Sequence, residues 1–207
     1  MAIKPILFNT EMVRAILGGR KTCTRRLVKP QPDEKHTCPL GFVTDSKEVG
    51  CFGFGIDEYG GFIQYAKPSY HTDDILYVRE TWMDYAGLTM YKADCDKYRL
   101  ESLKLAEFSW KPSIHMPKEA ARIWLKVTDV RVERLQDITA DGIRNEGLSS
   151  AAVHAGDIEI AMEEWKILWN STIKKADLDR YGWDANPWVW AISFERCEKP
   201  KINLKFK

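Results

Sequence analysis

The chain has 207 residues, a formal net charge of +1 at pH 7, 44% hydrophobic residues and 29% charged residues. This composition excludes extensive disorder, and the small net charge excludes binding of nucleic acid or membranes through total charge alone. The length favours a single domain over residues 1–207. Five cysteines without a Cys-x-x-Cys pair, and no apolar run long enough to span a bilayer, predict a cytoplasmic protein with reduced thiols and no membrane partner.

A short helix is expected near the start of the chain. Asn9 and Thr10 offer side-chain oxygens that can cap its first turn. Gly18 and Gly19 can supply the left-handed residue that ends it. The apolar side chains recur at helical spacing between these limits, at Met12, Val13, Ile16 and Leu17.

A basic stretch, residues 18–26, follows this helix directly. It contains two glycines, four cations and two threonines, and no acidic residue occurs between Glu11 and Asp33. Because cations gathered in one place attract negative charge, the stretch predicts a site for an anionic ligand.

Residues 30–70 are rich in proline, glycine and aromatic residues, and they are interpreted as an irregular insertion. A small hairpin with a tight turn is expected at Gly60 and Gly61. Histidine and cysteine also occur in and beside the insertion, but their spacing matches no zinc pattern. We therefore expect neither a metal nor another cofactor.

The rest of the chain predicts a mixture of strands and helices. The expected elements are a strand over 75–82, a helix over 98–108, one bent strand or two short ones over 121–135, a helix capped by Thr139 and ended by Gly147, a helix over 157–169, and a strand over 188–194. Strands outnumber helices, which favours an α+β fold with a small, strongly curved sheet or barrel.

The pattern Gly19-x-Lys21-x-x-Thr24-x-Arg26 resembles the GxKxxTxR signature of the ASCH domain, a branch of the PUA-like β-barrel superfamily. The segments 113–117 and 181–188 resemble those of larger ASCH proteins from bacteria and their phages. The resemblance implies a small barrel with a cleft that binds RNA or a modified nucleoside.

Some small bacterial members of this family are amidohydrolases that remove acetate from N(4)-acetylcytidine with a lysine, a threonine and a glutamate. The resemblance places Lys21 and Thr24 in the first two roles, and Glu146, at the end of the helix after Thr139, in the third. Thr24 would attack the acetyl carbonyl, Lys21 would take its proton, and Glu146 would protonate the leaving nitrogen or hold the cytosine amino edge. Residues three apart lie on opposite faces of a regular strand, so the chain must turn between Lys21 and Thr24.

Six further side chains are predicted to contact RNA or the nucleoside: Arg20, Arg25, Arg26, Arg79, Glu80 and Trp82. Arg79 would face phosphate, Glu80 would accept from a base amino group, and Trp82 would stack on a base. Each has a structural alternative. Arg20 and Arg25 are expected to be solvated, and Arg26 is either a phosphate contact or a structural one. Arg79 and Glu80 can pair with each other, and Trp82 can be core.

Two other functions remain open from the sequence. The chain can be a non-catalytic RNA-binding module, or a phage-encoded interaction protein that blocks a host factor through its insertion and its basic tail, which includes Lys199, Lys201, Lys205 and Lys207. The sequence does not indicate the oligomeric state.

Overall fold

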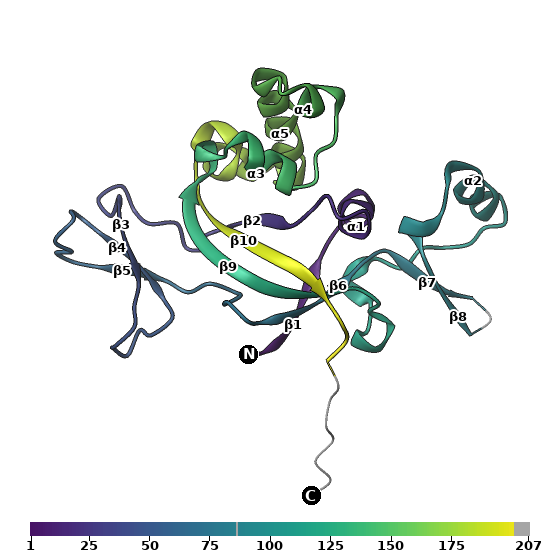
Figure 1. The fold of residues 1–207 in the computed structure, drawn as a ribbon, viewed down its shortest axis with the longest axis horizontal. Coiled ribbons are helices and arrows are strands. Elements are labelled where there is room, and N and C mark those ends of the chain that lie inside the picture. The colour runs from purple at the N-terminus through teal and green to yellow at the C-terminus, as the bar shows by residue number, and fades with distance from the viewer. Residues whose placement is uncertain (86, 201–207) are drawn as a thin grey trace, which may run out of the picture.

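A computed structural model describes residues 1–85 and 87–200, so Lys201, Lys205 and Lys207 of the basic tail lie outside the described residues. A central five-stranded sheet has the order β1-β6-β9-β10-β2 (Figure 1). Its strands are β1 (Ile3–Leu7), β2 (Cys23–Leu27), β6 (Ile75–Arg79), β9 (Trp124–Arg134) and β10 (Trp188–Cys197). β1 runs parallel to β6, and the other neighbours are antiparallel. Together with the helices this sheet confirms the predicted α+β class.

The central sheet is strongly curved along β9 and β10 (Figure 1), whose pairing carries a register shift between Ser193 and Phe194. One face, here the core face, carries Trp190 and Ile192 in the main hydrophobic core. The opposite face, here the helix face, carries Val189 in a second core. The edge strands β1 and β2 are joined by a side chain, because Arg26 Nη2 donates to the Leu7 carbonyl at 2.9 Å.

Helix α1 (Thr10–Leu17) connects the two edge strands of the sheet. Asn9 caps it by accepting a hydrogen bond from the Met12 N–H at 2.8 Å. Gly18 follows its last turn, and Gly19 has a φ of 72°. Both predicted limits of this helix are therefore confirmed, because each depends on residues next to each other in the sequence.

The insertion contains more regular structure than its composition predicted. Three antiparallel strands form a second sheet, the insertion sheet, made of β3 (Cys38–Phe42), β4 (Phe52–Gly55) and β5 (Gln64–Ala66). The hairpin expected at Gly60 and Gly61 exists between β4 and β5, but its connection is much longer than a two-residue turn. Phe54 points into the main core and is fully buried, which anchors the insertion sheet to the central one.

A second excursion from the central sheet follows β6. The predicted strand over 75–82 is interrupted, because the Glu80 N–H faces the Met116 sulfur at 3.2 Å instead of a neighbouring strand. The chain then forms β7 (Trp82–Tyr85), β8 (Leu88–Tyr91) and α2 (Lys97–Leu105). Figure 1 shows this excursion and the insertion sheet on opposite sides of the central sheet.

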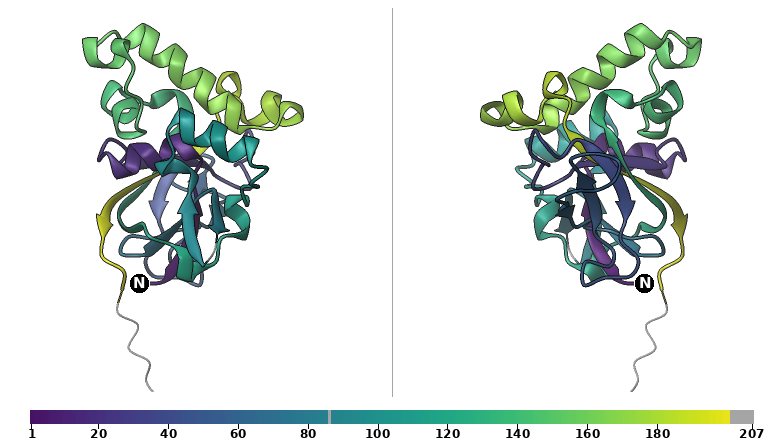
Figure 2. Two further views of the ribbon diagram at one scale, coloured as in Figure 1. Left: turned by 90° about the vertical axis from the view of Figure 1, so that its right-hand side faces the viewer. Right: turned by 90° about the vertical axis from the view of Figure 1, so that its left-hand side faces the viewer.

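The remaining helices cover the helix face of the sheet. They are α3 (Ala140–Asn145), α4 (Ala151–Ala155), α5 (Ile158–Thr172) and α6 (Leu178–Tyr181). Figure 2 shows this layer at the end of the molecule away from the N-terminus. Trp165 and Trp169 of α5 are buried in the second core together with Val189. No helix within residues 1–85 and 87–200 is long and apolar enough to cross a membrane.

Candidate functional site

The basic stretch passes from an isolated bridge at Lys21 into the edge strand β2. Lys21 forms an isolated β-bridge with Glu146, Thr22 is exposed and outside the sheet, and the regular strand begins only at Cys23. The regular pairing is therefore interrupted only at Thr22, whose carbonyl still accepts from the Phe194 N–H of β10 at 2.8 Å. Within β2 the side chains alternate, so Thr24 and Arg26 share the core face while Arg25 lies on the helix face.

A buried ion pair joins Lys21 to the end of α3. Lys21 Nζ donates to Glu146 Oε2 at 2.6 Å and to the Glu146 carbonyl at 3.0 Å. The two side chains are 0% and 2% exposed. Gly147 makes this approach possible, since a Cβ there would lie 2.8 Å from Ala15 Cβ and 3.0 Å from Lys21 Cβ. Its φ of 95° also suits glycine.

The second oxygen of Glu146 faces β2. Oε1 accepts from the Arg25 backbone N–H at 2.7 Å and from Arg25 Nη1 at 3.2 Å. Arg25 also donates through Nε to Glu133 Oε1 at 2.6 Å, and its guanidinium lies 5.9 Å from the centre of the Trp165 ring. The expectation that Arg25 is solvated is therefore wrong. Strand alternation turns it toward the helix face, where two carboxylates neutralise it.

Thr24 lies beside this cluster on the core face and is 2% exposed. The Phe8 ring, which directly follows β1, lies close to two cations of the stretch: Lys21 Nζ is 5.6 Å and the Arg26 guanidinium 5.4 Å from its centre. Burial lowers the pKa of Arg26, although the Glu146 carboxylate acts in the opposite direction. The Lys21 amine and the Arg26 guanidinium thus both lie near the Phe8 ring.

Arg20 lies at the surface beside the cluster. Its Nη1 donates to Ser149 Oγ at 2.5 Å and to the Gly147 carbonyl at 3.3 Å. The Arg20 guanidinium is therefore bound to the segment that directly follows Glu146, and it remains exposed to solvent.

Within the described residues, the structure brings none of the side chains of Arg79, Glu80 and Trp82 into the cluster, although the Arg79 carbonyl accepts from the Phe8 N–H at 3.2 Å. Arg79 Nε donates to the Met116 carbonyl at 2.7 Å. Trp82 is 8% exposed, and the Lys111 amine lies 4.7 Å from the centre of its ring. The contact of Arg79 with Met116 and the burial of Trp82 under Lys111 favour a structural role for both side chains.

Glu80 forms a separate buried ion pair. It is 1% exposed, and its two oxygens accept from Arg122 Nε at 2.9 Å and Nη2 at 3.1 Å. Arg122 also donates to Asp94 at 2.6 Å. Burial raises the pKa of Glu80, although Arg122 opposes that effect. The partner of Glu80 is therefore Arg122, not Arg79.

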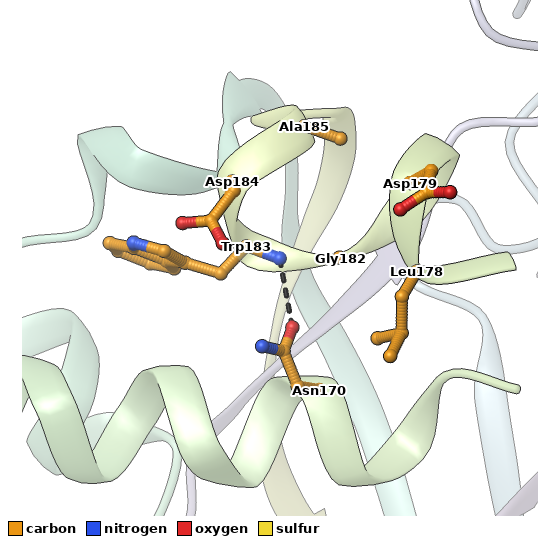
Figure 3. Close-up of a pocket in the computed structure, with 7 residues that line it drawn as sticks. All are labelled: Asn170, Leu178, Asp179, Gly182, Trp183, Asp184 and Ala185. Atoms are coloured by element: carbon orange, nitrogen blue, oxygen red, sulfur yellow. Dashed lines mark hydrogen bonds between the residues drawn. The ribbon is translucent and has the colours of Figure 1, made fainter. Parts of the chain in front are cut away.

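One cavity borders the cluster, and a second one lies apart from it in the helix layer. A cavity of about 180 Å³ lies between α1, α5 and residues 146–148, so Glu146 contributes to its wall. A larger one of about 330 Å³ lies between α5 and α6, where the Asn170 side chain accepts from the Trp183 N–H at 2.8 Å (Figure 3). None of the predicted site residues lines this second cavity.

Comparison with known proteins gives one structural neighbour. No protein-family model matches the chain. No curated protein matches it either. The fold is similar to a crystal structure of an ASCH domain from Lactobacillus crispatus JV V101, with a TM-score of 0.38 and 9% sequence identity, over 94% of this chain and 79% of that chain. This neighbour is an ASCH domain, the family that the Gly19 to Arg26 motif predicts.

Proposed function

We propose that this chain binds RNA or a modified nucleoside and hydrolyses the amide of an acylated cytidine such as N(4)-acetylcytidine. The observation that carries the proposal is the shared carboxylate of Glu146. It binds Lys21 Nζ at 2.6 Å and, through its other oxygen, the peptide N–H that directly follows Thr24 at 2.7 Å. The carboxylate thus binds the proposed base directly and the peptide group next to the proposed nucleophile, which supports a common role for the three residues.

The Lys21–Glu146 ion pair can carry out every proton transfer of the acyl-transfer step and return to its starting charge state. A proton passes from the Lys21 ammonium to Glu146, which leaves a neutral amine next to Thr24. The Thr24 oxygen then attacks the acetyl carbonyl while its proton returns to Lys21, and the protonated Glu146 gives its proton to the leaving cytidine nitrogen. This step forms an acetyl ester on Thr24 and restores the charged pair. Water then hydrolyses the ester and releases acetate.

Arg26 is suited to stabilise charge in this reaction. One of its nitrogens is bound to the Leu7 carbonyl, while a guanidinium has five N–H donors in total. The remaining donors can face the developing oxyanion or a substrate oxygen on the core face. We assign Arg26 this binding role, because strand alternation gives it the same side of β2 as Thr24.

The proposal is tested by following cytidine release from N(4)-acetylcytidine. Thr24→Val removes the hydroxyl at nearly constant volume, and we expect a loss of turnover of at least ~1000-fold for a missing nucleophile. Thr22→Val is the matched control, because Thr22 belongs to the same motif but is exposed. No release by the unaltered protein, or equal release by both variants, would contradict the proposal.

A non-catalytic RNA-binding module is the second candidate, and the complete pairing of Lys21 and Arg25 favours it. Such pairing also serves to tie β2 to α3 without chemistry. In that case the chain binds single-stranded RNA, does not hydrolyse the nucleoside, and loses affinity as salt rises because phosphate contacts release counterions. Titrations at two salt concentrations measure this dependence.

A further inference from the structure

A cavity outside the charged cluster lies where the insertion sheet meets the core face of the central sheet. Its volume is about 390 Å³, within the range of roughly 300 to 1,000 Å³ typical of small-molecule sites. It is lined by Phe42 and Gly50 of the insertion, by Tyr70, His71 and Thr72 of the segment before β6, and by Asp129 and Val130 of β9.

Aromatic side chains give this cavity its character. Phe42 is 40% exposed, and its ring is held from behind by Trp190 at 6.2 Å and an interplanar angle of 25°. The Tyr70 hydroxyl donates to the Pro5 carbonyl at 2.8 Å, which fixes that ring as well. The aromatic surface is therefore set in place before any ligand arrives, and this reduces the entropic cost of binding.

Polar groups occur at only a few points of the lining. His71 is part-exposed, with Nδ1 3.9 Å from Asp74, and Thr72 offers a hydroxyl. Gly50 has a φ of 81°, and a Cβ there would lie 3.3 Å from His71 Nε2, so glycine lets the insertion close against the imidazole. Asp129 is paired with Arg131 at 2.6 Å. The lining residues include no lysine or arginine.

The strand register relates this cavity to the proposed site. Thr24, Ile192 and Val130 form one row across β2, β10 and β9. Two strand spacings separate the ends of this row, about 10 Å. Arg26 is paired with Trp190, the residue on which Phe42 stacks. The pKa of the Tyr70 hydroxyl lies above its usual value because the group is buried, and the nearby positive charge of Arg26 only partly offsets this effect.

We infer that this cavity is the seat of a nucleobase, which stacks on Phe42 and is contacted at its polar edge by His71 and Thr72. The inference rests on the proposed nucleoside binding and names the place of the base. A lining without cations disfavours phosphate, while a flat, weakly polar ring suits fixed aromatic faces.

The test is an NMR titration of the full chain with N(4)-acetylcytidine, cytidine, uridine and a short single-stranded RNA. Phe42→Ala removes the stacking face, and Phe42→Leu removes the ring but keeps apolar contact with Trp190. We expect both variants to bind roughly tenfold more weakly, in line with the effect of losing one stacked base. Phe62→Ala is the matched control, since Phe62 belongs to the same insertion, is 83% exposed and does not line the cavity.

The outcomes separate this seat from the proposed function. Chemical-shift changes at the Gly50 and Thr72 amides, with weaker binding by both Phe42 variants, support the seat. If the Phe42 variants bind the free nucleosides more weakly, the ligand of the seat is a mononucleoside. If they bind only the RNA more weakly, the ligand is a base within an RNA chain. Unaltered binding by both variants overturns the seat and leaves the proposed function intact. No binding of any of these ligands by the unaltered protein overturns both.

Discussion

Two buried glutamates in this molecule have the same kind of partner but different surroundings. Glu146 and Glu80 are 4% and 1% exposed, and each is paired with a basic side chain. Both oxygens of Glu80 bind one guanidinium, that of Arg122, at the base of the β7–β8 excursion. Glu146 divides its oxygens between Lys21 and Arg25, next to Thr24. Burial and pairing are therefore common to both carboxylates, and the difference is that Glu146 joins two cations of the basic stretch whereas Glu80 binds one guanidinium.

Replacing each glutamate in turn should give the largest difference in unfolding free energy between the two clusters. Glu146→Ala leaves Lys21 and Arg25 buried with only Glu133 to neutralise them, and we expect a loss of ~3–5 kcal/mol in unfolding free energy. Glu80→Ala leaves Arg122, which is 26% exposed and keeps Asp94, so we expect a loss of about 1–3 kcal/mol. Urea denaturation measures both. Equal losses would mean that the two clusters are energetically alike.

The next largest loss of stability is expected at Gly147, where the turn after α3 packs against Ala15 and Lys21. Gly147→Ala places a Cβ 2.8 Å from Ala15 at a φ of 95°, and we expect a loss of ~2–4 kcal/mol from strain and overpacking. Gly156→Ala is the matched control, because Gly156 has a φ of 78° and no atom within 4 Å of the added Cβ. There the cost is about 1 kcal/mol. Thermal unfolding of the two variants compares them, and equal shifts would argue against close packing at the cluster.

A third buried carboxylate, Asp74, predicts a smaller and pH-dependent effect. Burial acts to raise its pKa, but hydrogen bonds from Lys4 and from the backbone N–H groups of Ala2 and His71 outweigh it, so the pKa lies below its usual 3.8. A lowered pKa means stability that is present above pH 3.8 and is lost as pH falls through the folded-state value.

Asp74→Asn should remove this pH-dependent stability, about 1–3 kcal/mol at neutral pH. Urea midpoints between about pH 6 and 2 follow the difference, because the two proteins should converge at the acidic end. A constant difference down to the lowest pH would contradict the assignment.

Local signals predicted much of the fold. Asn9 and Gly19 bound α1, and Thr139 caps α3 through the Gly142 N–H at 3.1 Å, because capping depends on residues within one turn. The strands of the insertion were missed for the opposite reason. Glycine and proline within β3 and β4 weaken the strand pattern, and only their packing against the main core stabilises them.

In the candidate site, too, some features were predicted from the sequence and others were not. The motif resemblance placed Lys21, Thr24 and Glu146 together, although Lys21 and Glu146 lie 125 positions apart in the sequence. No local pattern could predict that Arg25 is buried, since its partner Glu133 is 108 positions away. Arg122 was missed for the same reason, since nothing near Glu80 in the sequence indicates it. Long-range ion pairs depend on sheet register, which composition and periodicity do not encode.

The central claim is that the hydroxyl of Thr24 takes part in chemistry instead of merely filling the core face of β2. The most direct measurement is the rate of cytidine release from N(4)-acetylcytidine by Thr24→Ser beside Thr24→Val. Because serine retains the hydroxyl, we predict turnover by Thr24→Ser within about tenfold of the unaltered protein, and none by Thr24→Val. Equal rates for the two variants would contradict the account.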